Sequence, residues 1–228
     1  MIPRLVIGSG EIPGGAGELR LIKRGSEYSI MLGANELMNS RVSGSEEALA
    51  AMACSGLRTD RPRILIGGLG MGFTLRAALA ELGAGASVLV AELVPAVIGW
   101  AEGALAHLMA GSLSDPRVSL IEADVGHVIA ASTSEFDAIL LDVDNGPDGL
   151  TVPSNDRLYD AGGLARAKAA LRPNGVLAIW SAAPDTAFAG RLRRAGFAVE
   201  ESVIAARGGG RGSRHVIWMA RKAGPSSR

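Results

Sequence analysis

A short acidic segment carries the residues of this chain that are best suited to chemistry. The apolar run 136–141 continues directly into Asp142, which Asp144 and Asn145 follow closely. In an open α/β sheet the carboxyl ends of the strands face the ligand crevice, so Asp142 should point into it. A carboxylate there could deprotonate or orient an amine nucleophile that attacks a carbon beside a sulfonium. For Asp144 and Asn145, an Asx-rich turn with only a local role is an equal alternative.

A glycine-rich loop follows the earlier apolar run 64–66. Its residues are Gly67, Gly68, Leu69, Gly70, Met71 and Gly72, and a helical pattern comes next. Glycines allow the backbone to approach a ligand closely, and a helix N-terminus adds free N–H groups and a positive dipole end. The pattern indicates a nucleotide-type site, although glycine-rich turns also serve packing alone.

Two acidic residues end the next two apolar runs. Glu92 lies about twenty residues beyond the loop, where a carboxylate can accept hydrogen bonds from two ribose hydroxyls. Asp124 ends the following run and could accept a bond from an adenine amino group. The alternative for Glu92 is a solvated residue at a strand end. The alternative for Asp124 is a helix N-cap, a role that is compatible with adenine binding.

The elements that position these residues alternate from residue 63 onward. Continuous apolar runs are typical of parallel strands buried on both faces, and helical patterns separate them. We predict an α/β fold with a doubly wound, mostly parallel seven-stranded sheet. The expected strands are 63–66, 87–91, 118–121, 136–141, 175–180, 198–206 and 215–220, and the expected helices are 73–82, 96–108, 127–131, 164–171 and 186–195.

The last two strands have no helix between them and should form a terminal antiparallel hairpin. By fold analogy this favours a class I S-adenosylmethionine-type domain over most nicotinamide-binding domains. We predict that this domain spans residues 61–222 and that residues 223–228 form a disordered tail.

Residues 1–60 should form a small β-hairpin region plus a linking helix. Short strands are expected at 5–7, 19–23 and 28–32, and a helix at 45–55, with Ser45 as its N-cap and Glu46 and Glu47 in its first turn. Such short strands do not make a stable independent sheet. We therefore expect their edges to pair with a second subunit in a homodimer.

Composition excludes several classes of protein. The 23 Lys and Arg residues balance 23 Asp and Glu residues, so no global basic field favours nucleic acid or an anionic membrane. No apolar run is long enough to span a bilayer, and the N-terminus has no signal-peptide pattern. The single cysteine, Cys54, leaves no disulfide framework, so we expect a cytoplasmic protein. Asp142 and Asp144 could bind Mg²⁺, but no further ligand cluster accompanies them, and we predict no metal.

The motifs together resemble the spermidine synthase family of aminopropyltransferases, which share the class I methyltransferase fold. The resemblance covers roughly residues 28–180. Its matching segments are short but stand in a family-like order: 66–72, 115–118, 123–125, 141–147, 158–159 and 170–175.

The resemblance implies a donor, an acceptor and a set of site residues. The donor would be decarboxylated S-adenosylmethionine or S-adenosylmethionine itself, and the acceptor a small-molecule amine. Asp142 would be the catalytic base, and Asp144, Tyr159 and Glu36 would bind the acceptor. The donor site would comprise Gly67, Gly68, Leu69, Gly70, Gly72, Glu92, Leu93, Asp124 and Val125.

The acceptor half of the site departs from the family pattern. Gly70 stands where the family has an aspartate near the aminopropyl amine, and Glu36 replaces a glutamine. Asp144 comes one residue early, and the segment that follows Glu36 lacks the family's acidic pair and tyrosine. Two other functions therefore stand beside aminopropyl transfer: methyl transfer from S-adenosylmethionine to an unknown substrate, and ligand binding without catalysis.

Overall fold

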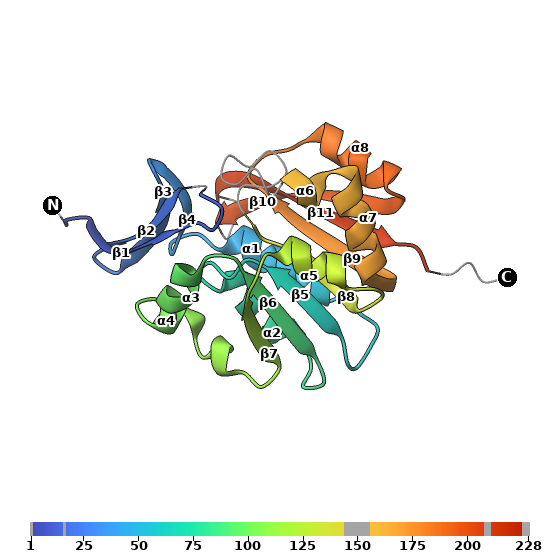
Figure 1. Ribbon diagram of the computed structural model, residues 1–228, viewed down its shortest axis with the longest axis horizontal. Helices are drawn as coiled ribbons and strands as arrows, with labels where there is room; N and C mark the ends of the chain where they lie inside the picture. The colour runs from blue at the N-terminus through green and yellow to red at the C-terminus, as the bar shows by residue number, and fades with distance from the viewer. Residues whose placement is uncertain (1, 16, 144–155, 208–210, 225–228) are drawn as a thin grey trace.

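The computed structural model describes residues 2–15, 17–143, 156–207 and 211–224. Within them, a seven-stranded sheet flanked by helices stands beside a separate four-stranded sheet (Figure 1). The elements in chain order are β1 (Leu5–Glu11), β2 (Glu18–Arg24), β3 (Glu27–Leu32), β4 (Asn35–Asn39), α1 (Gly44–Cys54), β5 (Arg63–Gly67), α2 (Phe73–Glu81), β6 (Ser87–Glu92), α3 (Pro95–Glu102), α4 (Ala106–Met109), a 3₁₀ turn η1 (Ser112–Ser114), β7 (Val118–Glu122), α5 (Val125–Ala131), β8 (Phe136–Leu141), α6 (Asp156–Tyr159), α7 (Ala161–Ala170), β9 (Leu171–Ser181), α8 (Thr186–Arg194), β10 (Phe197–Arg207) and β11 (Arg211–Lys222).

The large sheet has the strand order β10-β11-β9-β8-β5-β6-β7. Strands β9, β8, β5, β6 and β7 pair in parallel, whereas β11 runs antiparallel to both β9 and β10. The predicted α/β class, the mostly parallel sheet and the terminal hairpin are therefore confirmed. Across the described residues, no helix has both the length and the apolar character needed to span a bilayer.

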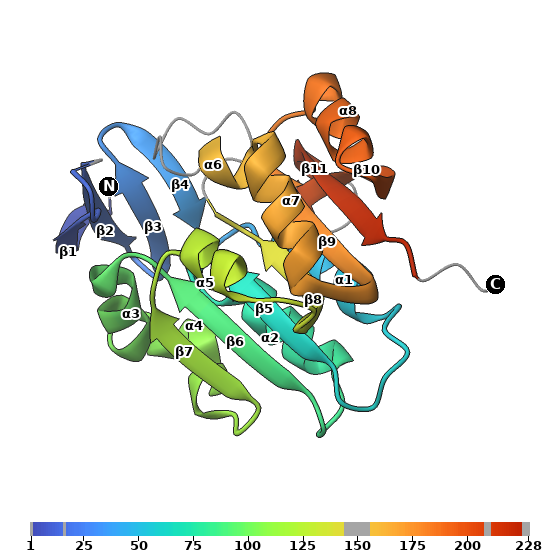
Figure 2. The same ribbon diagram turned by 45° about the vertical axis from the view of Figure 1, so that its right-hand side comes forward.

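Successive strand residues enter different cores on the two faces of the large sheet. Ile64 and Ile66 of β5 belong to the core that also contains residues of α1, α2 and α3, whereas Leu65 belongs to the core that contains residues of α5, α7 and α8. Because both faces are covered, the central strands consist almost entirely of apolar residues, as parallel strands require. Because β6 and β8 both pair in parallel with β5, the carboxyl ends of these three strands reach the same edge of the sheet (Figure 2).

The N-terminal sheet is antiparallel in the order β1-β2-β3-β4. Its first three strands match the prediction in place, whereas β4 was not predicted. Leu19, Tyr28 and Ile30 from β2 and β3 join the core cluster that covers one face of the large sheet. The two sheets therefore share apolar packing, which fixes the small sheet at the edge where the strands end.

Two helix predictions need correction. The predicted helix 96–108 is two helices, α3 and α4, because the backbone of Gly103 leaves the helical conformation. Helix α1 follows Ser43, so Ser45 is not its N-cap. Ser45 instead lies in the first turn, completely buried, and its hydroxyl bonds to other side chains.

Candidate functional site

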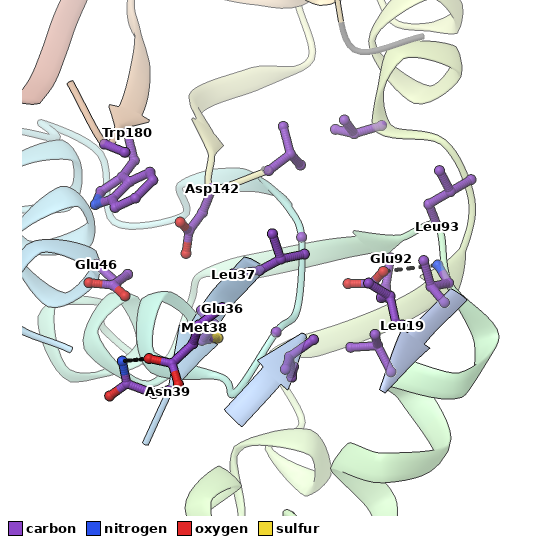
Figure 3. A pocket seen from close by; sticks show the side chains of 18 of the residues that line it. Leu19, Glu36, Leu37, Met38, Asn39, Glu46, Glu92, Leu93, Asp142 and Trp180 are labelled. Atoms are coloured by element: carbon purple, nitrogen blue, oxygen red, sulfur yellow. Dashed lines mark hydrogen bonds between the residues drawn. The ribbon is translucent and has the colours of Figure 1, made fainter. Parts of the chain in front are cut away.

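A cavity of about 490 Å³ lies at the carboxyl ends of the parallel strands. This volume falls within the usual range for sites that bind small molecules and cofactors. The N-terminal sheet closes one side of the cavity with Leu19, Ile30 and Met38. Figure 3 shows Glu92 and Leu93 toward one end, and Asp142, Glu46 and Trp180 toward the other.

The glycine loop forms the floor between the two ends. Gly68 and Gly70 line the cavity with positive φ angles of 89° and 50°. A Cβ atom on Gly68 would lie 2.4 Å from the backbone oxygen of Asp142, so this position requires glycine. Gly70 lies beneath the sulfur of Met38, which also accepts a hydrogen bond from the Met71 N–H at 3.2 Å.

The other predicted loop residues support this floor without lining the cavity. Gly67 packs against Val125 and accepts a hydrogen bond from the Asp142 N–H at 3.0 Å. Gly72 precedes α2 in the left-handed conformation, and Leu69 is buried in the core. The glycine loop therefore begins at the end of β5 and is hydrogen-bonded there to the backbone of Asp142.

Glu92 is buried at the end of β6, with 7% of its surface exposed. Its two carboxylate oxygens accept hydrogen bonds from the Leu69 N–H at 2.8 Å and the Val94 N–H at 2.9 Å. Burial raises the pKa of Glu92, and these backbone bonds oppose the rise. The oxygens have lone pairs left for ribose hydroxyls, and Leu93 lines the cavity beside them.

Asp124 caps helix α5. Its Oδ1 accepts a hydrogen bond from the Gly126 N–H at 2.7 Å. Asp124 and the neighbouring Val125 also line the cavity, and the N–H of Ala123, which precedes Asp124, donates a hydrogen bond to the Glu92 carbonyl at 2.9 Å. The N-cap role is therefore observed, and adenine binding by Asp124 stays a prediction.

Asp142 follows β8 and borders the cavity at its other end (Figure 3). Its Oδ2 accepts a hydrogen bond from the Thr74 hydroxyl at 2.5 Å. Burial in the protein and the nearby charge of Glu46 raise the pKa of Asp142 to about 7, while the Thr74 bond opposes the rise. A carboxylate with this pKa can accept and release a proton near neutral pH, as a general base must.

Sequence reasoning missed the cluster that faces Asp142. Glu46, Trp180 and His215 line the cavity there. The Ser45 hydroxyl lies 2.6 Å from Glu46 Oε2 and 2.8 Å from His215 Nδ1. The rings of Trp180 and His215 pack edge to face with centroids 4.7 Å apart.

The three predicted acceptor-binding residues differ in where they lie. Glu36 lines the cavity, and its carboxylate accepts hydrogen bonds from Ser29 at 2.7 Å and Asn39 at 2.9 Å. Tyr159 is buried away from the cavity lining and packs edge to face on Phe188. Asp144 lies outside the described residues. Substrate binding by these residues stays a prediction.

The described lining of the cavity is acidic. It contains one histidine, His215, and neither lysine nor arginine. Its carboxylates come from Glu36, Glu46, Glu92, Asp124 and Asp142. Such a lining attracts cationic ligands and disfavours a free carboxylate on a ligand. In the described part of the chain, no three His, Cys, Asp or Glu side chains group as a metal site would require.

Comparisons with known proteins show a sequence similarity to aminopropyltransferases and a shared fold. No protein-family model matches the chain. The polyamine aminopropyltransferase of Mycobacterium tuberculosis (strain CDC 1551 / Oshkosh) is 35% identical over 145 residues, which cover 60% of this chain and 27% of that protein. The chain thus spans about a quarter of the length of the curated relatives that it matches.

Solved structures agree with this similarity at the level of the fold. A spermidine synthase in complex with the transition-state analogue AdoDATO superimposes with a TM-score of 0.77 at 20% identity, over 96% of this chain and 74% of that one. The 1,6-didemethyltoxoflavin-N1-methyltransferase of Burkholderia thailandensis, with bound S-adenosylhomocysteine, gives a TM-score of 0.54 at 22% identity over 79% of each chain. The chain therefore has the methyltransferase-like fold that aminopropyltransferases also adopt.

Proposed function

We propose that the protein is a transferase that moves an aminopropyl group from decarboxylated S-adenosylmethionine to a small-molecule amine. The observation that carries the proposal is the position of Asp142. Its carboxylate, with a pKa raised to about 7, borders an acidic cavity beside a glycine loop of the nucleoside-binding type. The sequence similarity to polyamine aminopropyltransferases supports the same reaction.

The donor site accounts for the nucleoside part of the ligand. Gly68 and Gly70 leave room for the donor near the loop, and Glu92 and Asp124 offer carboxylate oxygens to ribose hydroxyls and an adenine amino group. Asp142 takes a proton from the acceptor nitrogen, whose lone pair then attacks the carbon beside the sulfonium. The C–S bond breaks with its electron pair on sulfur, so the leaving group is neutral methylthioadenosine. Asp142 afterwards releases the proton.

The charge of the cavity favours the decarboxylated donor. Its cationic amine suits the acidic lining, whereas the carboxylate of S-adenosylmethionine would meet neither lysine nor arginine among the described lining residues. Gly70 favours the second candidate, methyl transfer, because the family's aspartate at this position is absent. Calorimetry with the two donors separates the candidates: tighter binding of S-adenosylmethionine would favour methyl transfer.

The activity is tested by incubating the purified protein with decarboxylated S-adenosylmethionine and an amine. We expect release of methylthioadenosine with at least one acceptor among putrescine, spermidine, cadaverine and agmatine. Binding of the donor without product for any of them would contradict aminopropyl transfer. Failure to bind either donor or methylthioadenosine at millimolar concentration would leave the third possibility, a non-catalytic protein on the same fold.

We also propose a homodimer formed through the N-terminal sheet. Strand β1 is an edge strand and exposes 55% of Leu5, 56% of Val6 and 41% of Ile7. An exposed apolar edge of this kind favours pairing with another strand. Light scattering at micromolar concentration should give twice the chain mass, and a monomeric mass would contradict the proposal. We place the dimer in the reducing cytoplasm, where the single, buried Cys54 stays a free thiol.

A further inference from the structure

Two neighbouring glutamates at the start of α1 have different surroundings. Glu47 is exposed, and its carboxylate accepts a hydrogen bond from the Ser43 hydroxyl at 2.8 Å. This is the usual place for an acidic residue in the first turn of a helix, where it complements the helix dipole. Glu46 has only 7% of its surface exposed and lines the cavity on the side of Asp142 (Figure 3). The helix dipole alone does not explain a buried carboxylate, because burial of a charge is costly.

A chain of hydrogen bonds holds Glu46 in the cavity. The Ser45 hydroxyl has a single proton, and it donates this proton to Glu46 Oε2 at 2.6 Å. The contact of 2.8 Å between Ser45 Oγ and His215 then requires that Nδ1 of the imidazole carries a proton and donates it. Trp180 packs against this imidazole. Residues from α1, β9 and β11 thus fix one carboxylate opposite another.

We propose that Glu46 is a second acceptor-binding carboxylate, which holds the ammonium group of a cationic amine opposite Asp142 while Ser45 and His215 keep it in position. The proposal rests on the proposed function, because it assigns the acceptor to the Asp142 end of the cavity. The ligand class is a primary amine that arrives protonated. Neutral or anionic nucleophiles would leave two buried carboxylates without a counter-charge, which is costly.

The acceptor would also change the ionisation of Asp142. In the free protein, burial raises the pKa of Glu46, and the charge of Glu46 helps to raise that of Asp142. An ammonium group between the two carboxylates lowers both pKa values, because it stabilises their charged forms. Asp142 is therefore ionised when the acceptor is in place. Among the described lining residues, the other titratable side chains are those of Glu36, Glu92, Asp124 and His215.

The test compares Glu46→Gln with Glu47→Gln as a matched control. Calorimetry would measure the affinity for putrescine in the presence of methylthioadenosine, so that the readout does not depend on turnover. Glu46→Gln should weaken putrescine binding by about tenfold to a hundredfold, as expected for the loss of a charge-assisted bond. It should leave methylthioadenosine affinity within about twofold, since the amide keeps the size of the side chain and the other end of the cavity is unchanged. Glu47→Gln should change neither affinity.

A pH profile adds a second readout. In Glu46→Gln the acidic limb of kcat should move to lower pH, because Asp142 loses a neighbouring negative charge. Ser45→Ala should weaken putrescine binding by a smaller factor, since Glu46 keeps its charge but loses its support.

Each outcome decides between the two proposals. Unchanged putrescine affinity and an unchanged pH profile in Glu46→Gln would overturn the role of Glu46, even where the parent protein makes product. Weakened putrescine binding in a protein that binds both ligands but releases no product would support Glu46 and contradict the transferase. Absence of binding of putrescine, spermidine, cadaverine and agmatine alike in the parent protein would also overturn the role of Glu46.

Discussion

The carboxylates at the two ends of the cavity accept hydrogen bonds from different kinds of donor. At the proposed nucleoside end, Glu92 accepts hydrogen bonds from the backbone N–H groups of Leu69 and Val94, and Asp124 accepts one from the Gly126 N–H of α5. At the proposed acceptor end, Asp142 accepts a hydrogen bond from the Thr74 hydroxyl, and Glu46 accepts one from the Ser45 hydroxyl. Backbone donors are fixed by the fold, whereas a hydroxyl can rotate and exchange its role. The first arrangement favours rigid binding, and the second favours a change in protonation.

The buried acids of this cavity therefore need not share one role. Burial raises the pKa of Glu92, Glu46 and Asp142 alike. Two backbone N–H groups stabilise the ionised form of Glu92 and oppose the rise, while Asp142 has a like charge nearby that adds to it. Proton transfer should therefore be separable from donor binding by mutation.

The largest effect is expected for Asp142→Asn. The amide keeps the size of the side chain but cannot take a proton from the amine substrate, so turnover should fall by about 10²–10⁴-fold. Methylthioadenosine affinity, measured by calorimetry, should stay within about twofold, because the donor end is unchanged. Normal turnover in this variant would show that Asp142 is only a turn residue and that the two ends do not differ as described.

The pH dependence of stability should come next in size. In the folded protein the pKa of Asp142 rises from 3.8 to about 7, so the folded state binds its proton more tightly than the unfolded state does. The free energy of unfolding should therefore fall as pH increases from about 4 to 7. Asp142→Asn should reduce this fall, and Glu46 and Glu92 should account for part of the remainder. Urea titrations at several pH values would measure it, and an equal fall in both proteins would contradict the assignment.

Glu92→Ala should mainly affect the donor. Loss of a charge-assisted bond to a ribose hydroxyl costs about 1.5–3 kcal/mol, or roughly tenfold to a hundredfold in affinity. The Leu69 and Val94 N–H groups also lose their acceptor, so the thermal midpoint should decrease. Calorimetry with methylthioadenosine checks the affinity. A variant with unchanged donor affinity and reduced turnover would reverse the proposed roles of the two ends.

The smallest effect is expected for Gly70→Ala. The φ angle of 50° is unfavourable for alanine by roughly 1 kcal/mol. The new Cβ would lie 2.8 Å from the Met38 sulfur, at the flexible end of a side chain that can move. Donor affinity should therefore fall by less than about tenfold. Gly68→Ala is the matched comparison, because its Cβ would meet backbone rather than a movable side chain, and a milder loss there than at Gly70 would contradict the structure.

Much of this arrangement was predictable because parallel strands have a strong sequence signal. The runs 63–66 and 136–141 are mostly apolar, with Arg63 and Asp137 as their charged residues. The ends of such runs indicated where to look for the glycine loop, Glu92, Asp124 and Asp142. Strand β4 was missed because its sequence, Asn-Glu-Leu-Met-Asn, has no β-branched residue and begins and ends with asparagine. Hydrogen bonding to β3 stabilises β4 as a strand, although the composition of β4 does not favour one.

The acceptor end could not be predicted because it depends on contacts between distant segments. Glu46 and Glu47 both fit the first turn of a helix, and only tertiary packing determines which one is buried. His215 is a single histidine without a nearby partner in sequence, and Ser45 lies 170 residues from it. One signal was available: Ser45 and Glu46 lie within the segment where the family pattern is lost.

The closure of the cavity by the N-terminal sheet links ligand binding to the folding of that sheet. Leu19, Ile30 and Met38 form part of the cavity wall, so a ligand that needs this wall adds its binding free energy to the stability of β2, β3 and β4. Backbone amides in these strands should consequently exchange with deuterium more slowly when methylthioadenosine is bound. The first forty residues would then act as a reporter of occupancy, with protection from exchange that rises with ligand concentration.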